Sequence, residues 1–139
     1  MTTVNLNTIE LNEFIGKHDP KQHCRATFPM FRPHGTKVTA TVYFEIEPGD
    51  NLGMHVDNAE ELLFIVEGEA EIIVGEEQVH AKERTIAHVP GLVPHDIINT
   101  GKTKLKVLGM FGGTADIIAK FDKEWLPTES RVIDTTLVT

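Results

Sequence analysis

The fold of this chain is indicated most clearly by GDNLGMHVDNAEELLFIVEG, residues 49–68. His55 and Asp57 are two residues apart, so on a strand their side chains would point the same way. On one straight strand, Glu61 would lie roughly 20 Å from His55, too far to share an ion. However, residues 58–60 are turn-like and an apolar run follows them. We therefore predict one hairpin, in which Glu61 begins a second strand that folds back beside His55 and Asp57.

Short strand-like segments follow one another through the middle of the chain. They are rich in β-branched and aromatic residues, and turn signals such as Pro48-Gly49-Asp50 separate them. The predicted strands are 37–47, 61–66, 70–74, 78–81, 85–89, 96–99 and 104–110. Many short strands divided by Gly and Pro indicate an all-β sandwich or barrel.

The two ends of the chain are expected to differ from this region. The predicted organisation is one domain with an irregular N-terminal segment packed on the barrel (1–36), a barrel core (37–113), and a short helix with a tail (114–139). The helix is predicted because Ile117, Phe121 and Trp125 are four residues apart and would share one helical face. A second short helix is expected near residues 9–15.

A further candidate ligand comes from a later part of the chain. His95 follows Pro90-Gly91 and Pro94 and begins another predicted strand. Because the hairpin supplies two or three ligands, His95 is the residue that would complete a metal site from elsewhere in the barrel.

At these residues the sequence resembles the cupins. Their first motif is Gly, five residues, His-x-His, three or four residues, Glu, six residues, Gly. This spacing is reproduced, with an aspartate in place of the second histidine, by Gly49, His55, Asp57, Glu61 and Gly68. Their second motif is Gly, five residues, Pro-x-Gly, two residues, His, three residues, Asn. It is matched more loosely, with the inner glycine one position early and Arg84 in place of the first glycine, by Pro90, Gly91, His95 and Asn99.

The resemblance implies a double-stranded β-helix, or jelly-roll, barrel with one divalent metal ion in its mouth. It implies that His55, Glu61 and His95 are ligands, while Asp57 is either a fourth ligand or a residue that orients a ligating histidine. Two imidazoles with carboxylates favour Fe(II) or Mn(II), with zinc and nickel as alternatives. A barrel that has lost its metal through the change at position 57 is the opposing hypothesis.

A metal with open coordination positions would act on a small organic molecule. The resemblance favours a metal-dependent enzyme, with a dioxygenase as the first choice and an isomerase or decarboxylase next. Asp57 would then be a ligand or a base, and Glu60 is a second candidate general base. The alternative is a barrel that binds a small molecule without turnover, because fold does not determine function.

Composition excludes several other classes. The net charge of −8 argues against binding to nucleic acid or to an anionic membrane, since both need clustered cations. The only serine, Ser130, lies in a tail with Pro and Glu, which excludes a serine nucleophile on a strand–helix elbow. The single cysteine, Cys24, and the absence of an export signal predict a cytoplasmic protein.

The run Leu62–Val66 is apolar at every position, so both sides of its strand would be apolar. One side fills the barrel and the other needs a cover. A second subunit is a natural cover, and we predict a homodimer.

Overall fold

The structure, a computed structural model, describes residues 1–139, and its regular secondary structure consists almost entirely of β-strands. The strands are β1 Asn12–Gly16, β2 His23–Thr27, β3 Thr39–Ile46, β4 His55–Asp57, β5 Glu61–Glu67, β6 Glu69–Val74, β7 Glu77–Lys82, β8 Ile86–Val89, β9 His95–Asn99, β10 Leu105–Gly112, β11 Ile118–Leu126 and β12 Ser130–Asp134. The helical elements are two 3₁₀ turns, η1 Arg32–His34 and η2 Thr135–Leu137. No helix has the length and hydrophobicity needed to span a bilayer.

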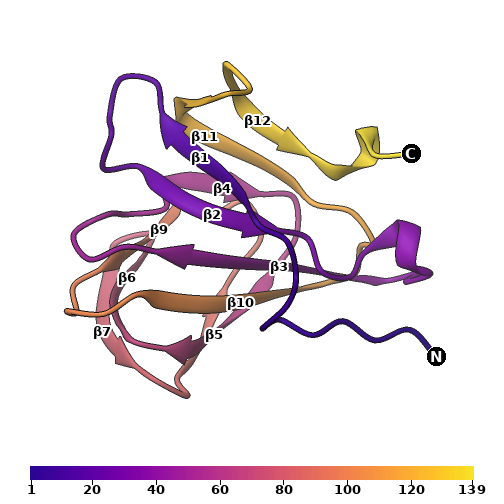
Figure 1. Cartoon of the computed structure of the whole chain (residues 1–139), viewed down its shortest axis with the longest axis horizontal. Helices are drawn as coiled ribbons and strands as arrows, with labels where there is room; N and C mark the ends of the chain where they lie inside the picture. The colour runs from indigo at the N-terminus through magenta and orange to yellow at the C-terminus, as the bar shows by residue number, and fades with distance from the viewer.

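The strands join into one curled antiparallel sheet (Figure 1). The strand order is β7-β6-β9-β4-β11-β1-β2-β3-β10-β5-β8, with β12 paired to β11. The order contains two halves, β8-β5-β10-β3 and β7-β6-β9-β4. As the chain runs from β3 to β10, it crosses repeatedly from one half to the other. This is the topology of a jelly-roll barrel, so the all-β jelly roll expected from the sequence is confirmed.

The predicted strands between residues 37 and 110 match observed strands to within two residues at each end. Their side chains alternate between the barrel interior and the outside, as the pleat requires. In β5, for example, Leu63 and Ile65 are buried, whereas Leu62 and Val66 are exposed. The interior is filled by inward-facing apolar side chains, and those that are fully buried include Phe44, Ile46, Ile65, Ile72, Val89, Ile97, Leu105, Val107 and Trp125.

The predicted C-terminal helix is not formed; residues 118–126 belong to strand β11, and Ile117 directly precedes it. The spacing of Ile117, Phe121 and Trp125 fits both structures, because four residues are close to one helical turn and also an even number of strand positions. In the structure these three side chains and Ala119 are buried. Pairing of β11 with β1, β4 and β12 therefore overrides the helical pattern.

The N-terminal part is also more regular than expected. It contains β1 and β2, which pair with each other as an antiparallel hairpin, in place of an irregular segment with a helix at 9–15. β1 joins β11 on one side, and β2 joins β3 on the other. The hairpin therefore closes the sheet between its two halves (Figure 1).

The outside of β5 and its neighbours carries an apolar surface that the rest of the chain covers only in part. Phe64 lies opposite Ile86 on β8 and Leu108 on β10, and Leu62 lies opposite Met110. Leu62 and Ile86 are 43% and 61% exposed. We call this surface the outer patch; its residues are Leu62, Phe64, Val66, Ile86, Leu108 and Met110. A homodimer remains the prediction for this patch, because burying it would remove apolar area from water.

The homodimer can be tested by size-exclusion chromatography with light scattering. We expect the wild type to elute with twice the mass of the chain. Leu62→Glu places a charge in the outer patch and should weaken association at least tenfold, so that the variant elutes as a monomer. Val79→Glu is the control, because Val79 is 54% exposed on β7, outside the patch. A monomeric wild type would refute the prediction.

Candidate metal centre

The four predicted ligands come from both halves of the sheet. His55 and Asp57 lie on β4, and His95 lies directly opposite His55 on β9. Glu61 begins β5 in the other half, because residues 58–60 carry the chain across the barrel. The predicted hairpin is thus not formed, since β4 and β5 do not pair. The turn that it required is present, and all four side chains are buried in the interior, with relative exposures of 3–5%.

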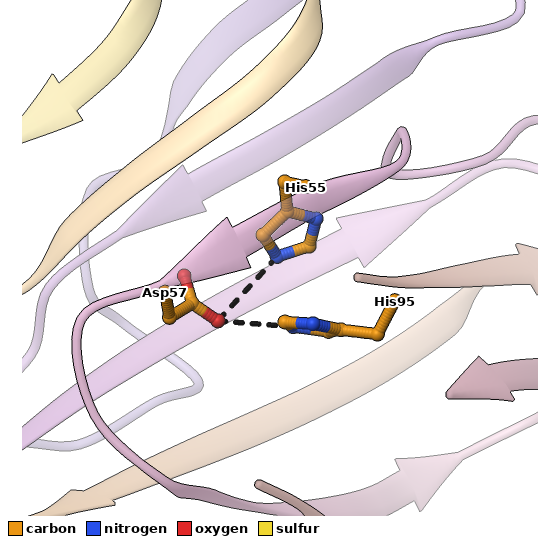
Figure 2. Close-up of side chains that lie close together, drawn as sticks. All are labelled: His55, Asp57 and His95. Atoms are coloured by element: carbon orange, nitrogen blue, oxygen red, sulfur yellow. Dashed lines mark ion pairs between the residues drawn. The ribbon is translucent and has the colours of Figure 1, made fainter. Parts of the chain in front are cut away.

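The side chains converge on one carboxylate oxygen. Oδ2 of Asp57 lies 2.9 Å from Nε2 of His95 and 3.6 Å from Nε2 of His55 (Figure 2). The ligand atoms of these three residues all lie within 4.8 Å of one another. Glu61 approaches from one side, with Oε1 at 3.6 Å from Nε2 of His95. The first three residues are therefore grouped closely enough for one ion, and Glu61 borders that group.

Backbone carbonyl groups fix the orientation of both imidazole rings. Nδ1 of His55 donates to the carbonyl of Gly53 at 2.7 Å, and Nδ1 of His95 donates to the carbonyl of Val93 at 2.9 Å. A carbonyl oxygen can only accept, so Nδ1 carries the proton in each ring. Nε2 of both histidines is left facing the carboxylates, in the tautomer that a metal ligand needs.

A buried carboxylate stands behind His55. Asp96 accepts hydrogen bonds from the backbone N–H groups of Gly53 at 2.8 Å and Ile97 at 2.7 Å, and from Nδ2 of Asn51 at 3.0 Å. Gly53 has a φ of 107°, a conformation that favours glycine, and it connects Asp96 to His55 through its N–H and its carbonyl. Asp96 thus helps to hold the segment that orients His55.

The donor set fits a cation. Oδ2 of Asp57 and Nε2 of His95 are buried, and neither has a hydrogen-bond partner of acceptable geometry, although they lie 2.9 Å apart. Two atoms that both present lone pairs repel at that distance unless a positive charge lies between them. Two imidazole nitrogens and carboxylate oxygens are ligands of Fe(II), Mn(II) and Zn(II), so a divalent ion would satisfy these atoms.

The pKa values of His55, His95 and Glu61 also indicate that the site favours a positive charge. Burial lowers the pKa of His55 to about 4, so its ring is neutral near pH 7. Burial also acts to lower the pKa of His95, but the carboxylates of Asp57 and Glu61 outweigh it and raise this pKa to about 10. Burial raises the pKa of Glu61 to about 7. The site therefore retains a positive charge, which a proton on His95 supplies when no metal does.

The four side chains lie at a small cavity of about 60 Å³ inside the barrel. Of its 19 lining residues, 15 are hydrophobic, and the other four are His55, Asp57, Glu61 and His95. Aromatic rings contribute much of the wall, among them Phe121, which stacks on the His55 ring at a centroid distance of 4.4 Å. Apart from the candidate ligands, a molecule in this cavity would meet mainly hydrocarbon, together with the neutral side chains of Cys24 and Trp125.

Comparison with known families identifies this architecture. Residues 42–111 match the family model described as "Cupin domain". This chain belongs to the cupin family. The match spans half of the chain and contains all four candidate ligands, so the resemblance seen in the two motifs is confirmed. No curated protein matches the sequence.

Solved structures of other cupin-fold proteins are similar. A protein of Acidithiobacillus ferrooxidans, provisionally described as a sugar phosphate isomerase, is 14% identical with a TM-score of 0.67, and the match covers 100% of this chain and 94% of that one. A Thermotoga maritima protein, assigned by prediction as an oxalate decarboxylase, is 20% identical with a TM-score of 0.68, covering 80% and 98%. An oxalate decarboxylase of Lactobacillus farciminis is 17% identical with a TM-score of 0.72, covering 85% and 35%. At such identities the likeness shows the fold alone.

Glu60, the second candidate base, lies outside this cupin's cavity. Its side chain is exposed and forms an ion pair with His88 at 3.0 Å. Glu60 directly precedes β5 and is exposed, whereas Glu61, the first residue of the strand, is buried in the barrel. The candidate site thus retains Asp57 but not Glu60.

Sequence reasoning included Gly109 in the predicted strand 104–110 but gave it no role in the site. Gly109 lies within β10, opposite Leu63 on β5. A Cβ atom there would collide with the carboxylate of Glu61 and would lie 2.8 Å from Val42. Gly109 therefore leaves the space that the Glu61 carboxylate occupies. A lone glycine inside a strand pattern is the signal that could have indicated such a close approach.

Gly109→Ala tests whether the position of Glu61 matters for metal binding. The added methyl group should displace the Glu61 carboxylate and lower metal affinity by about 10–100-fold, the usual effect of disturbing the support of a ligand. Affinity can be measured by competition with a chelating dye. Gly112→Ala is the control, because a Cβ atom there has no neighbour within 4 Å. Unchanged affinity in folded Gly109→Ala would rule out Glu61 as a ligand.

Proposed function

We propose that this cupin is a metal-dependent enzyme that acts on a small organic molecule held in the 60 Å³ cavity. The observation that carries the proposal is the group formed by His55, Asp57 and His95, whose ligand atoms lie within 4.8 Å of one another at the cavity wall. The unpartnered buried atoms of Asp57 and His95 support it, because a bound cation would satisfy both.

Each of these side chains has a role in the proposal. His55 and His95 bind through Nε2, while their Nδ1 atoms stay bonded to backbone carbonyl groups. Glu61 binds from the opposite half of the barrel. Asp57 is a fourth ligand or, if it stays unbound, the base nearest to a substrate in the cavity. Fe(II) or Mn(II) is favoured by the mixture of imidazole and carboxylate, with zinc and nickel as alternatives.

A dioxygenase is the first choice for the reaction. The bound ion would polarise a substrate oxygen and, as Fe(II), would allow reaction with O₂. The cavity offers no acid–base side chain apart from the candidate ligands, which favours chemistry performed mainly at the ion. The apolar wall excludes water and would protect a reactive species from hydrolysis.

An isomerase or decarboxylase is the second candidate. Its support is the nearness of the Asp57 carboxylate to the cavity and the names of similar structures, an isomerase and two decarboxylases. Oxalate and sugar phosphates are anions, however, and no lysine or arginine lines this cavity. The names of the similar structures therefore support isomerase or decarboxylase chemistry better than they support oxalate or a sugar phosphate as the substrate. A binding protein without turnover is the remaining alternative, and the scarcity of acid–base groups supports it.

Metal analysis by mass spectrometry, on protein purified without a tag or a chelator, tests the proposal. We expect close to one divalent ion per chain in the wild type and a loss of at least tenfold in His95→Ala. His88→Ala is the control, because His88 is exposed and pairs only with Glu60. A wild type that neither contains metal nor takes it up would mean that Asp57 marks a lost site.

Turnover can be tested by incubating the metal-loaded protein with a panel of small organic compounds, with and without air. A dioxygenase should consume O₂ and lose all conversion under anaerobic conditions. Conversion that continues without air would indicate isomerase or decarboxylase chemistry. No conversion of any compound would favour the binding protein.

A further inference from the structure

The cavity carries almost no charge once a divalent ion is bound. Its polar lining consists of two histidines, which bind metals as neutral rings, and the carboxylates of Asp57 and Glu61. Two carboxylates cancel the two positive charges of a divalent ion. The cupin motif with a second histidine at position 57 would leave one positive charge, so Asp57 removes the charge that would attract an anion.

Nothing else in the wall replaces that charge. The chain contains 13 lysines and arginines, and none of them lines the cavity. The two remaining lining groups with a polar hydrogen are neutral. Trp125 contributes an N–H, Nε1, without a hydrogen-bond partner, and Cys24 contributes a buried thiol whose pKa burial raises to about 12.

An anion entering this cavity would exchange water for hydrocarbon and would meet a metal ion whose charge the carboxylates of Asp57 and Glu61 already balance. Burial of an unpaired charge is strongly unfavourable, whereas an uncharged molecule loses little and gains apolar contacts. An uncharged molecule can still coordinate the metal ion through a single neutral oxygen atom.

We propose that the substrate of this site is an uncharged and largely apolar small molecule, which contacts the metal through a neutral carbonyl or hydroxyl oxygen. The proposal rests on the proposed function for the presence of the ion. It separates this chain from cupin-fold proteins that act on small dicarboxylates or phosphate esters, because here position 57 contributes a negative charge to the site.

Binding can be followed without turnover through the fluorescence of Trp125, the single tryptophan of the chain, which lines the cavity. The protein is loaded with Zn²⁺, which is redox-inactive, and is titrated with butan-2-one, propionamide and propionate. These probes have nearly the same size and differ in charge. We expect butan-2-one and propionamide to bind at least tenfold more tightly than propionate. Equal or tighter binding of propionate, or no binding of any probe, would overturn the proposal.

Asp57→His tests the assigned cause of this preference. The substitution gives the loaded site one positive charge, so the affinity for propionate should rise at least tenfold while that for butan-2-one changes little. Asp122→His is the matched control, because it makes the same change of charge at an exposed position of β11. An unchanged preference in Asp57→His that still contains one ion per chain would refute the role of Asp57.

Metal content is measured on every sample, so failure of the two proposals can be distinguished. Wild-type protein that binds the ion but prefers propionate contradicts the substrate class and leaves the metal centre intact. Wild-type protein that takes up no ion, yet binds butan-2-one more tightly than propionate, contradicts the proposed function and supports the uncharged ligand.

Discussion

Two carboxylates and two imidazoles can be buried together in an apolar barrel only if a positive charge lies among them. An unpaired ion in such an interior costs several kcal/mol, which is a large part of the stability of a small domain. The strong upward shift in the pKa of His95 shows how much the pocket favours that charge, because it persists although burial opposes it. A metal ion meets the same demand with more ligand atoms than a proton can. The four buried side chains therefore form a site that a cation would satisfy, and the strands, bends and glycines around them are understood best by how they position these side chains.

The backbone brings the ligands together in two steps. Pairing of β4 with β9 sets His55 beside His95, and the two-residue spacing on β4 points Asp57 the same way. The turn at 58–60 then carries the chain to the other half, where Glu61 faces them. The supporting contacts lie outside the cavity wall. Backbone carbonyl groups orient the imidazoles, and Gly109 leaves a gap for the carboxylate. Local geometry of the chain thus places each donor atom, and the hydrophobic core holds that geometry in place.

Much of this arrangement follows from local sequence pattern. The strands between 37 and 110 are predictable because alternation and turn residues act over a few positions, and the ligand residues because their spacing matches a known motif. The pattern fails where the outcome depends on distant partners. Ile117, Phe121 and Trp125 fit a helix as well as a strand, and pairing of β11 with β4 makes the choice. The role of Gly109 depends on Glu61, which is 48 positions earlier in the chain. Similarly, nothing beside Asp96 in the sequence indicates that it supports Gly53 from a neighbouring strand.

The composition of the cavity wall separates two functions, the selection of the bound molecule and the chemistry at the ligands. Because its charged groups are all candidate ligands, the shape of the cavity and its uncharged side chains are left to select the molecule that enters, and the ligand set is left to determine reactivity. Residues outside the cavity can influence that reactivity only through the groups that support the ligands. The clearest such support runs from Asp96 to His55. Asp96 accepts a hydrogen bond from the N–H of Gly53, and the carbonyl of Gly53, which belongs to the next peptide unit, accepts one from Nδ1 of His55. Asp96 therefore acts on His55 by holding the Gly53 segment in place. The Nδ1 acceptor of His95 is the carbonyl of Val93. The two imidazoles thus differ in what holds their acceptors, and His55 is the ring whose orientation a buried carboxylate supports.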